Sequence, residues 1–227
     1  MIENIPQHVA IIMDGNRRWA RQNGHFESYG HSVGSERVYD VCKWCLELGV
    51  ENLSLYAFST ENWNRDEAEI VELENLIGHY LRSKNAKELQ ENGVRIRIVG
   101  DVSKFNDSLQ RKLKQYEADT GKNDKLFLNI ALGYGGRDEI VRAVNVALAK
   151  GGVYQISESD ISDNLCIESA PDLLIRTGGH QRLSNFMLWQ MAYTEMYFAK
   201  VMWPAFLRDD FIDAINFFST TKRNFGK

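Results

Sequence analysis

Asp14 begins a run of residues whose types suit the binding of a phosphate group. The run directly follows the apolar segment 9–13 and reads Asp14-Gly15-Asn16-Arg17-Arg18-Trp19-Ala20-Arg21. Glycine lets the backbone approach an anion closely, while arginine side chains and the N–H groups at a helix start supply hydrogen-bond donors. A carboxylate beside them suits Mg²⁺, which usually takes one or two carboxylates and leaves its other positions to phosphate and water. The run predicts a magnesium-assisted phosphate site; the alternative is a helix cap with solvated arginines.

Three further runs of glycine, polar and arginine residues also follow apolar segments. They read Ser59-Thr60-Glu61-Asn62-Trp63-Asn64-Arg65, Gly133-Tyr134-Gly135-Gly136-Arg137 and Thr177-Gly178-Gly179-His180-Gln181-Arg182-Leu183-Ser184-Asn185. In an open parallel sheet, ligands bind beyond the carboxyl ends of the strands. If each run follows a strand, the four runs can together surround one anionic group. The candidate donors are Arg17, Arg18, Arg65, Arg176 and Arg182.

The common nucleotide-binding and hydrolase motifs are absent from the sequence. There is no G-x-x-x-x-G-K-[ST] loop, and Gly133-Tyr134-Gly135-Gly136 lacks the third glycine of a dinucleotide-binding turn. ATP and NAD are therefore disfavoured as ligands. The G-x-S-x-G motif of serine hydrolases is also missing. His31 lies near a predicted helix start and can reach a diphosphate, although a structural role is the alternative.

Short apolar runs alternate with longer helical patterns along the chain. Strands are predicted at 8–13, 53–58, 94–99, 126–131 and 173–176. Helices are predicted at 34–48, 66–91, 103–120, 138–150 and 209–218. Several strands are continuous apolar runs, which is typical of a parallel sheet with helices on both faces. The sequence therefore predicts an α/β fold with a central, mostly parallel sheet, as a single domain over residues 1–227.

The composition is that of an ordinary globular protein and limits the classes of function. Lys plus Arg number 27 and Asp plus Glu 31, so the net charge of −4 disfavours a general nucleic-acid binder. The longest apolar runs are far shorter than the ~20 residues that cross a bilayer, and residues 1–7 show no signal peptide. We therefore expect a soluble, cytoplasmic protein without nucleic-acid partners.

The three cysteines fit a reducing compartment, because an odd and sparse set makes no disulfide framework. Cys42 and Cys45 form a C-x-x-C pair, but they lie well inside the predicted helix 34–48. The redox interpretation needs the first cysteine at a helix start, and no further ligands have the spacing of a zinc site. We predict that the pair packs in the core.

Several long motifs, spread over nearly the whole chain, resemble those of the cis-prenyltransferases, and most closely those of bacterial undecaprenyl diphosphate synthases. They are His8-Val9-Ala10-Ile11-Ile12-Met13-Asp14-Gly15-Asn16-x-Arg18-Trp19-Ala20, Gly30-His31, Tyr56-Ala57-Phe58-Ser59-Thr60-Glu61-Asn62-Trp63-Asn64-Arg65, Asn129-Ile130-Ala131-x-x-Tyr134-Gly135-Gly136-Arg137, Arg176-Thr177-Gly178-Gly179-x-x-Arg182-Leu183-Ser184-Asn185-Phe186-x-Leu188-Trp189-Gln190-x-Ala192-Tyr193-x-Glu195 and Arg223-x-Phe225-Gly226. The resemblance implies a homodimer whose subunits each contain a hydrophobic tunnel. It also implies Mg²⁺-dependent condensation of an allylic diphosphate, such as farnesyl diphosphate, with isopentenyl diphosphate.

The resemblance also implies a role for each matching residue. Asp14 matches the carboxylate that binds Mg²⁺ and diphosphate, and Asn62 matches the proton acceptor. Glu195 matches a second metal carboxylate, which can come from the partner subunit's side. The other substrate-binding positions are Gly15, Asn16, Arg17, Arg18, Trp19 and His31 for the allylic diphosphate, Ser59, Thr60, Glu61, Trp63 and Arg65 beside Asn62, and Arg176, Arg182 and Ser184 for isopentenyl diphosphate, with Leu183 between them.

These roles agree with the chemistry. Diphosphate leaves an allylic carbon when its developing charge is neutralised, which Mg²⁺ and arginine can do, and a proton must then be removed. A neutral amide is a poor base, so water or a phosphate oxygen is an alternative to Asn62. The hydrocarbon needs an apolar lining. The candidates on the helix 66–91 are Ile70, Leu73, Leu76, Ile77, Tyr80 and Leu81; an ordinary core face is the alternative.

The chain departs from the usual bacterial pattern at several positions. Glu27 stands where an arginine that supports diphosphate binding is usual, and Arg17 replaces a common glycine. The remaining departures are His180-Gln181 without the usual acidic residue, Asp66 in place of a proline, and Glu72 and Glu74 in place of apolar residues. These differences concern the affinity for isopentenyl diphosphate and the product length. They leave Asp14, Asn62 and Glu195 in place.

Three alternatives compete with a long-chain synthase. Asp209-Asp210-Phe211-Ile212-Asp213 reads as the D-D-x-x-D motif of trans-prenyl synthases, but those proteins are all-helical and carry two such motifs, so we favour an acidic helix start. A non-catalytic regulatory subunit is a second alternative, which retention of the catalytic carboxylates disfavours. A short-chain or irregular cis-prenyl coupling enzyme is the third. If the product is a long polyprenyl diphosphate, we expect transient peripheral contact with a membrane.

Overall fold

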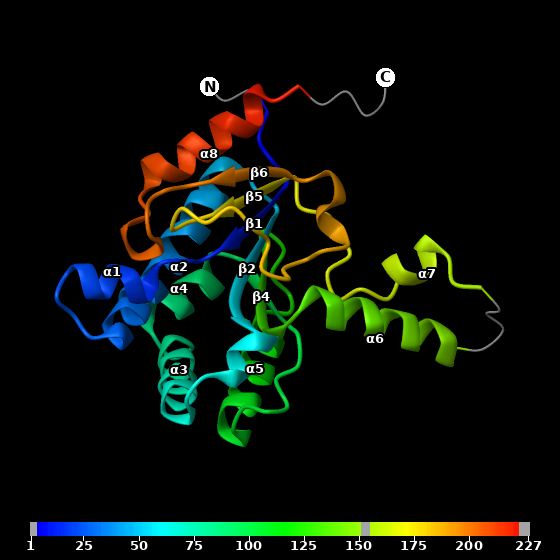
Figure 1. Ribbon diagram of the computed structural model, residues 1–227, viewed down its shortest axis with the longest axis horizontal. Coiled ribbons are helices and arrows are strands. Elements are labelled where there is room, and N and C mark those ends of the chain that lie inside the picture. The colour runs from blue at the N-terminus through cyan, green and yellow to red at the C-terminus, as the bar shows by residue number, and fades with distance from the viewer. Residues whose placement is uncertain (1–3, 151–154, 223–227) are drawn as a thin grey trace.

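Six parallel strands form one sheet in the computed structural model, which describes residues 4–150 and 155–222 (Figure 1). The strands are β1 His8–Ile12, β2 Asn52–Ser59, β3 Val94–Val99, β4 Leu126–Tyr134, β5 Leu173–Arg176 and β6 Glu195–Phe198. Their order across the sheet is β3-β4-β2-β1-β5-β6. The predicted α/β fold and its five strands are confirmed, whereas β6 was not predicted. This short edge strand is half-exposed along its whole length, so it lacks a buried apolar run.

The register of the strands brings three of the polar runs to one edge of the sheet. Ile12, the last residue of β1, lies opposite Tyr56 of β2 and Arg176 of β5, and Ser59 of β2 lies opposite Tyr134 of β4. The residues that follow β1, β2 and β5 therefore meet at the carboxyl edge, as expected for a site in an open parallel sheet.

The helices are α1 Asn16–Gln22, α2 Glu27–Leu48, α3 Glu67–Tyr80, α4 Lys84–Glu91, α5 Asp107–Thr120, α6 Gly136–Ala149, α7 Glu158–Ser162 and α8 Arg208–Thr220. Short 3₁₀ helices are η1 Thr60–Asn64, η2 Gln190–Tyr193 and η3 Trp203–Ala205. The single helix predicted over 66–91 is wrong, because it is two helices. Ser83 ends the continuity by capping α4, accepting a hydrogen bond from the Ala86 backbone N–H at 3.1 Å. Neither α1 nor α7 was predicted, and α2 begins seven residues earlier than expected.

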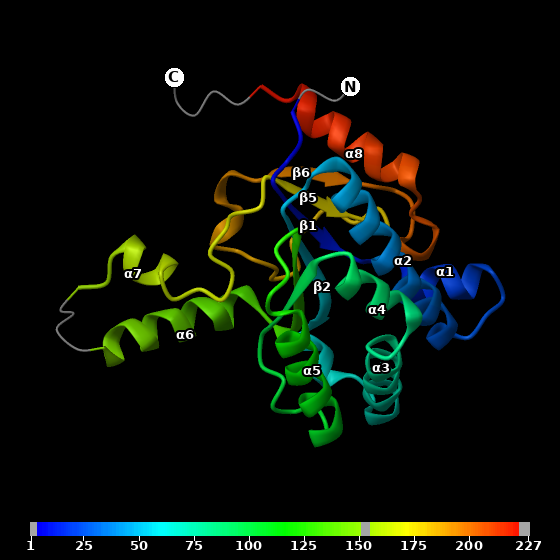
Figure 2. The same ribbon diagram turned by 180° about the vertical axis from the view of Figure 1, so that it is seen from behind.

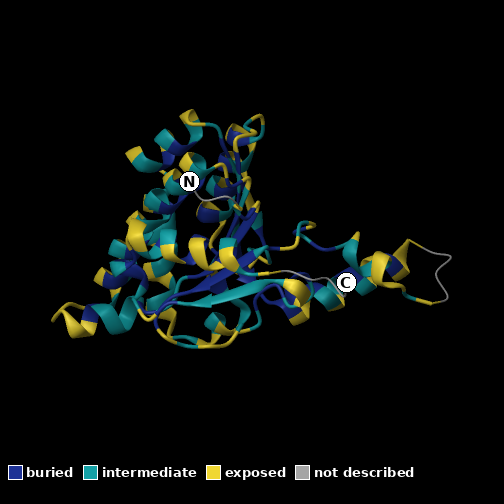
Figure 3. Ribbon diagram, turned by 90° about the horizontal axis from the view of Figure 1, so that it is seen from above, coloured by how far each residue is buried: buried dark blue, intermediate teal, exposed yellow. Residues whose placement is uncertain are grey.

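The long helices pack mainly on one face of the sheet (Figures 2 and 3). The core on that face joins the sheet to buried residues of α2, α4 and α8, including Cys42, Leu89 and Phe211. The opposite face is covered mainly by residues 183–191, among which Phe186 and Met187 are fully buried. The sheet is flanked by helices as predicted, although an irregular segment covers most of the second face.

Two smaller sequence predictions concern the surroundings of this core. Cys42 and Cys45 lie fully buried in α2, and burial raises the pKa of both thiols, so the pair packs as predicted. The acidic run near the C-terminus begins α8, where the Asp210 carboxylate accepts a hydrogen bond from the Leu207 backbone N–H at 2.8 Å. That contact is a helix cap, as the alternative to a D-D-x-x-D metal motif predicts.

Candidate active site

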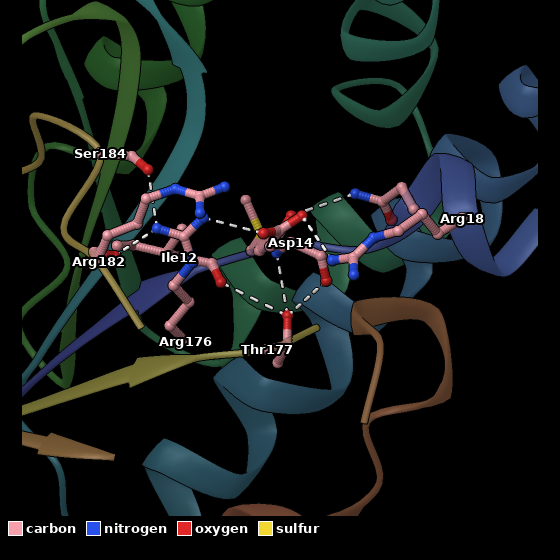
Figure 4. Close-up of polar contacts among 9 residues, drawn as sticks. Ile12, Asp14, Arg18, Arg176, Thr177, Arg182 and Ser184 are labelled. Atoms are coloured by element: carbon pink, nitrogen blue, oxygen red, sulfur yellow. Dashed lines mark hydrogen bonds and ion pairs between the residues drawn. The ribbon is translucent and has the colours of Figure 1, made fainter. Parts of the chain in front are cut away.

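Asp14 lies between two arginines at the carboxyl end of β1 (Figure 4). Its Oδ2 accepts a hydrogen bond from Arg176 Nη2 at 2.9 Å, and its Oδ1 accepts one from Arg18 Nη2 at 3.3 Å. Arg176 ends β5 and its side chain is 4% exposed, whereas the Asp14 side chain is 26% exposed. A fixed, nearly buried guanidinium thus meets a carboxylate that solvent and ligands can reach.

Thr177 fixes the backbone of Asp14 from the neighbouring strand end. Its Oγ1 accepts a hydrogen bond from the Asp14 N–H at 3.0 Å and donates one to the Asp14 carbonyl at 2.7 Å. Sequence reasoning did not assign Thr177 a role in the site. The available signal was its position directly after a predicted strand, beside Arg176.

Two glycines allow the loops around Asp14 to come together. Gly15 has a φ of +110°, and a Cβ there would lie 2.8 Å from Met202 Cβ. Gly178 has a φ of +80°, and a Cβ there would lie 2.5 Å from Arg18 Nη2. Both positions therefore need glycine for backbone conformation and for space. The sequence predicted that an anion approaches Gly15 closely. In the structure, the atoms closest to the place of a Cβ at Gly15 belong to Met202.

Arg176 also organises the loop that follows β5. Its Nη1 donates to Ser184 Oγ at 2.8 Å and to the carbonyl of Arg182 (Figure 4). Ser184 and Asn185 have positive φ values of 50° and 64°, which non-glycine residues seldom adopt. The structure thus brings Arg176 and Ser184 together as predicted, but Arg182 contributes its carbonyl while its side chain is exposed.

Asn185, which was not assigned a role, links this loop to two other strand ends. Its Nδ2 donates to Glu61 Oε1 at 3.0 Å, and its Oδ1 accepts from the Arg137 N–H at 2.9 Å. Arg137 belongs to the first turn of α6, which follows β4. The runs after β2, β4 and β5 are therefore joined at one edge, as predicted.

Arg17 and Arg65 form a second group with two acidic residues. Arg17 Nε contacts Glu27, and Arg17 Nη1 lies 3.6 Å from Glu69 Oε1. The same Glu69 oxygen accepts a hydrogen bond from Arg65 Nη1 at 2.8 Å. Arg17 and Arg65, both predicted to bind diphosphate, are thus ion-paired to carboxylates on α2 and α3. An incoming diphosphate would have to compete with Glu27 and Glu69 for these guanidinium groups.

His31 lies beside this group of charges. Its Nε2 is buried and has no hydrogen-bond partner among the described residues. Burial, reinforced by the Arg65 and Arg17 guanidinium groups and opposed by Glu69, lowers the pKa of His31 from 6.5 to about 4. The imidazole is therefore neutral near pH 7, and a negatively charged ligand nearby would favour its protonation.

This lowered pKa predicts a loss of stability in acid. The unfolded chain takes up a proton near pH 6.5 and the folded chain only near pH 4, so stability is full above pH 6.5 and falls as the pH drops towards 4. We expect His31 to contribute up to about 3 kcal/mol to this fall. Urea unfolding over this pH range measures it for the native protein and for His31→Gln.

The exposed His79 supplies the control for that experiment. His31→Gln should flatten the acid slope only in part, because burial also lowers the pKa of His8 to about 4. His79→Gln should leave the slope unchanged. An equal slope in the native protein and His31→Gln would contradict the assignment.

Asn62 and its neighbours form the turn after β2. The Asn62 side-chain oxygen accepts a hydrogen bond from the Ser59 backbone N–H at 2.9 Å, which closes a reciprocal cap at the start of η1. Thr60 Oγ1 donates to Glu61 at 3.1 Å. Trp63 packs against Phe58 and Phe105 and does not line the cavity described below. The predicted residues of this run thus divide between turn formation, packing and the cavity wall.

An apolar cavity of about 230 Å³ opens beside the polar groups. The predicted residues of α3 and its end that line it are Leu73, Leu76, Ile77, Tyr80 and Leu81, whereas Ile70 does not. Asn16, His31, Asn62 and Arg65 also line it, together with Met13, which directly precedes Asp14. The cavity thus joins a mouth lined by polar side chains to an apolar interior, an arrangement that suits a ligand with a polar head and a hydrocarbon tail.

The carboxylates around Asp14 are too few to form a metal site by themselves. Within residues 4–150 and 155–222, no group of three or more His, Cys, Asp or Glu residues could hold a metal ion. A single exposed carboxylate fits Mg²⁺, whose remaining positions are filled by phosphate oxygens and water. Asp14 is the one predicted metal ligand at this strand edge.

Glu195 lies elsewhere in the sheet. It begins β6 and pairs in register with Leu173, at the start of β5, whereas Asp14 follows the carboxyl end of β1. The structure therefore does not bring Glu195 to Asp14 within one chain. The remaining predicted positions are Trp19, which stacks with His25 and Tyr29, and Leu183, which packs against a core cluster. Arg223, Phe225 and Gly226 lie outside the described residues.

Comparison with known proteins identifies sequences and structures similar to nearly the whole chain. A family model described as "Putative undecaprenyl diphosphate synthase" matches residues 12–226. The chain is 46% identical over 227 residues to the farnesyl-diphosphate-specific ditrans,polycis-undecaprenyl-diphosphate synthase of Escherichia coli K12, covering 97% of this chain and 89% of that protein. It is 45% identical to an isoprenyl transferase of Aquifex aeolicus, covering 98% and 96% of the two chains.

Two crystal structures resemble the fold closely. Lavandulyl diphosphate synthase from Lavandula x intermedia, in complex with dimethylallyl diphosphate, superposes with a TM-score of 0.93 at 34% identity, over 98% of this chain and 99% of that one. A probable undecaprenyl diphosphate synthase from Campylobacter jejuni gives a TM-score of 0.85 at 35% identity, over 99% and 100% of the two chains.

Proposed function

The chain belongs to the undecaprenyl diphosphate synthase family of cis-prenyltransferases, and from this premise we propose that it condenses isopentenyl diphosphate with an allylic diphosphate to make a polyprenyl diphosphate. The observation that carries the proposal is the ion-paired Asp14, between Arg18 and Arg176, beside an apolar cavity. The E. coli relative is named as specific for farnesyl diphosphate. We propose the same substrate here, and undecaprenyl diphosphate as the product.

The reaction breaks the bond between the allylic carbon and its diphosphate and forms a carbon–carbon bond to the alkene of isopentenyl diphosphate. Arg18 and the N–H groups at the start of α1 would bind the leaving diphosphate, whose charge rises as the bond breaks. Arg176, with Ser184 beside it, would bind the diphosphate of the second substrate. The apolar cavity would hold the hydrocarbon tail and exclude water from the reacting carbon.

A proton must leave the new C5 unit after the carbon–carbon bond forms. Asn62 lines the cavity, and its side-chain oxygen already accepts the Ser59 N–H. A neutral amide is a weak base, so its part would be to orient the substrate or a water molecule, with a diphosphate oxygen as the final acceptor. The experiment that separates these roles is Asn62→Ala, which should lower kcat more than it raises KM.

Mg²⁺ is the cofactor that this donor set would accept. Asp14 would supply its protein carboxylate, and substrate oxygens and water the other positions. When bound, the ion would neutralise charge on the leaving diphosphate. Addition of a chelator should stop turnover, and Mg²⁺ should restore it.

Incorporation of radiolabelled isopentenyl diphosphate by the pure protein, with farnesyl diphosphate and Mg²⁺, tests the proposed activity. Mass analysis of the products against a ladder of prenyl diphosphates gives the chain length. No incorporation would favour a non-catalytic regulatory subunit over an enzyme. A C10 or C15 product would favour a short-chain or irregular enzyme, an alternative that the likeness to lavandulyl diphosphate synthase and the pairing of Glu27 with Arg17 support.

The proposed homodimer would explain the separation of Glu195 from Asp14. Helix α6, which carries exposed Val141, Val146 and Leu148, extends with α7 away from the sheet and offers apolar surface to a second subunit (Figure 1). If Glu195 serves the partner's site, each active site is built from two chains.

Mixed dimers test this shared site. Asp14→Ala and Glu195→Ala should each lack activity, but in heterodimers one of the two sites retains both carboxylates. Unfolding and refolding an equal mixture should therefore recover roughly a quarter of the native activity, since half of the dimers are mixed and each has one intact site. Asp14→Ala mixed with Asp14→Asn is the control and should recover none. No recovery in the first mixture would place both carboxylates in the same chain's site.

A cytoplasmic location is also proposed, on the strength of the family resemblance and of three cysteines that remain free. Within residues 4–150 and 155–222, none of the helices has the length and apolar character needed to cross a bilayer.

A further inference from the structure

The turn between α1 and α2 presents an unusual cluster of exposed aromatic side chains. Phe26 is 89% exposed, more than any other large hydrophobic residue described, and Tyr29 is 48% exposed. Behind them, Trp19 and His25 both pack on Tyr29, with ring centroids 6.2 and 4.4 Å away. We call these four residues the aromatic turn. Because the rings of Trp19, His25 and Tyr29 pack on one another, they form a preformed base, beside which Phe26 is exposed.

The aromatic turn has no role in helix formation that would explain Phe26. Phe26 occupies the N-cap of α2, where its side chain makes no capping hydrogen bond. Serine, threonine, aspartate and asparagine are the residues that stabilise this position. An exposed phenylalanine there costs helix stability and solubility, which favours a contact with something apolar outside the chain.

The turn also lies at the rim of the active site. Glu27 and Ser28, which directly follow Phe26, line an outer hollow together with Arg17. That hollow shares His31, Leu73 and Leu76 with the apolar cavity, so these side chains separate the two spaces. Helix α1 lies at the outer edge of the molecule in both ribbon views (Figures 1 and 2). A surface that contacts the turn therefore faces the mouth of the site.

An exposed cation flanks the turn. Of the three arginines in residues 15–26, Arg17 pairs with Glu27 and Glu69 and Arg18 pairs with Asp14, whereas Arg21 is the most exposed of the three. Arg21 is 62% exposed on its side chain and contacts Glu27 only at 3.4 Å. Aromatic side chains flanked by arginine are typical of protein segments at the boundary between lipid headgroups and acyl chains.

We propose that the aromatic turn is the surface by which this protein contacts an anionic lipid bilayer, with Phe26 inserted among the acyl chains. The proposal rests on the proposed function, because a long polyprenyl product is insoluble in water and must pass into lipid. Contact at the turn places the mouth of the site against the membrane. A single aromatic turn gives weak, reversible binding, as a protein that returns to soluble substrates requires.

Flotation with vesicles tests this surface without any substrate. The vesicles are phosphatidylcholine alone or phosphatidylcholine with a minority of phosphatidylglycerol. Phe26→Ser should reduce binding to the anionic vesicles about tenfold, the effect of removing one aromatic side chain from lipid. Phe26→Trp should retain or increase binding. Serine suits an N-cap, so Phe26→Ser should fold at least as well as the native protein.

Tyr193 supplies a matched control, because it is 84% exposed and belongs to η2 rather than to the turn. Tyr193→Ser should leave vesicle binding unchanged. Three results would overturn the proposal: no vesicle binding by the native protein, equal losses in both serine variants, or a change of oligomeric state in Phe26→Ser, which would assign the turn to an interface between two copies.

The same variants separate this proposal from the proposed function. In detergent, Phe26→Ser should incorporate isopentenyl diphosphate at the native rate, because Phe26 does not line the cavity. Vesicle binding that depends on Phe26, in a protein without prenyltransferase activity, would support the surface and contradict the function. Full prenyltransferase activity without vesicle binding would support the proposed function and contradict the proposed membrane surface.

Discussion

Asp14→Ala is expected to reduce the incorporation of isopentenyl diphosphate by at least about 10³-fold. The substitution removes the carboxylate that pairs with Arg18 and Arg176 and that we propose as the protein ligand of Mg²⁺. Without it, the ion loses its carboxylate ligand from this chain, and the guanidinium groups of Arg18 and Arg176 lose their common partner. Initial rates at saturating substrate and Mg²⁺ measure the loss.

The fold should survive this substitution. Arg176 keeps its hydrogen bonds to Ser184 and to the Arg182 carbonyl, and the Asp14 side chain is already 26% exposed. We expect a cost of about 1–3 kcal/mol in the free energy of unfolding, which a domain of this size tolerates. Urea unfolding of the same preparation checks that lost activity is not lost structure.

Two further variants sharpen the test. Asp14→Asn keeps the shape and the hydrogen-bond acceptor but removes the charge, so it should be nearly as inactive as Asp14→Ala. Asp101 also follows the carboxyl end of a strand, β3, but its side chain accepts a hydrogen bond from the nearby Ser103 N–H at 2.9 Å. Asp101→Ala should therefore keep native activity. A near-normal rate in either Asp14 variant would remove the proposed mechanism.

The sequence predicted the site well where one strand carries both the apolar run and the polar residues after it. Val9 to Ile12 are buried on both faces, so the run is continuous, and Asp14 then follows at a determined place. Because parallel strands end at one edge, Arg176 could be expected near Asp14 although 162 residues separate them. Periodicity and topology together were enough for this part.

Contacts that depend on side-chain geometry could not be predicted in the same way. The break between α3 and α4 is decided by a cap at Ser83 within an otherwise helical pattern. Glu69 was placed on the predicted helix, but the sharing of its carboxylate by Arg17 and Arg65 requires three elements to converge. From residue types alone, the side chains of Arg17, Arg65 and Glu69 would be expected in solvent.

The covering of the second sheet face shows another limit. Continuous apolar strands require burial on both faces, and helices are the usual means. Here Phe186 and Met187, in a segment without regular structure, are fully buried against that face. An irregular segment has no periodicity, so the sequence indicated that a cover must exist without indicating what forms it.

Arg176→Lys is expected to lower kcat/KM for isopentenyl diphosphate by about 10²-fold. Arg176 Nη2 donates a hydrogen bond to Asp14. Its Nη1 donates to Ser184 and to the Arg182 carbonyl. A lysine ammonium is a single point on a flexible stem and cannot hold both sides of this fork. The positive charge is kept, so the loss reports geometry rather than charge, and it should appear mainly in KM.

Arg97 in β3 provides the matched control, because it is an arginine on a strand whose Nη2 donates to the Cys166 carbonyl at 3.1 Å, away from the site. Arg97→Lys should leave kcat/KM unchanged. Ser184→Ala removes one partner of Arg176 and should give a smaller loss than Arg176→Lys. If Arg176→Lys raised the KM of the allylic substrate alone, Arg176 would serve the first diphosphate rather than the second, and the two binding roles assigned to this edge of the sheet would have to be exchanged.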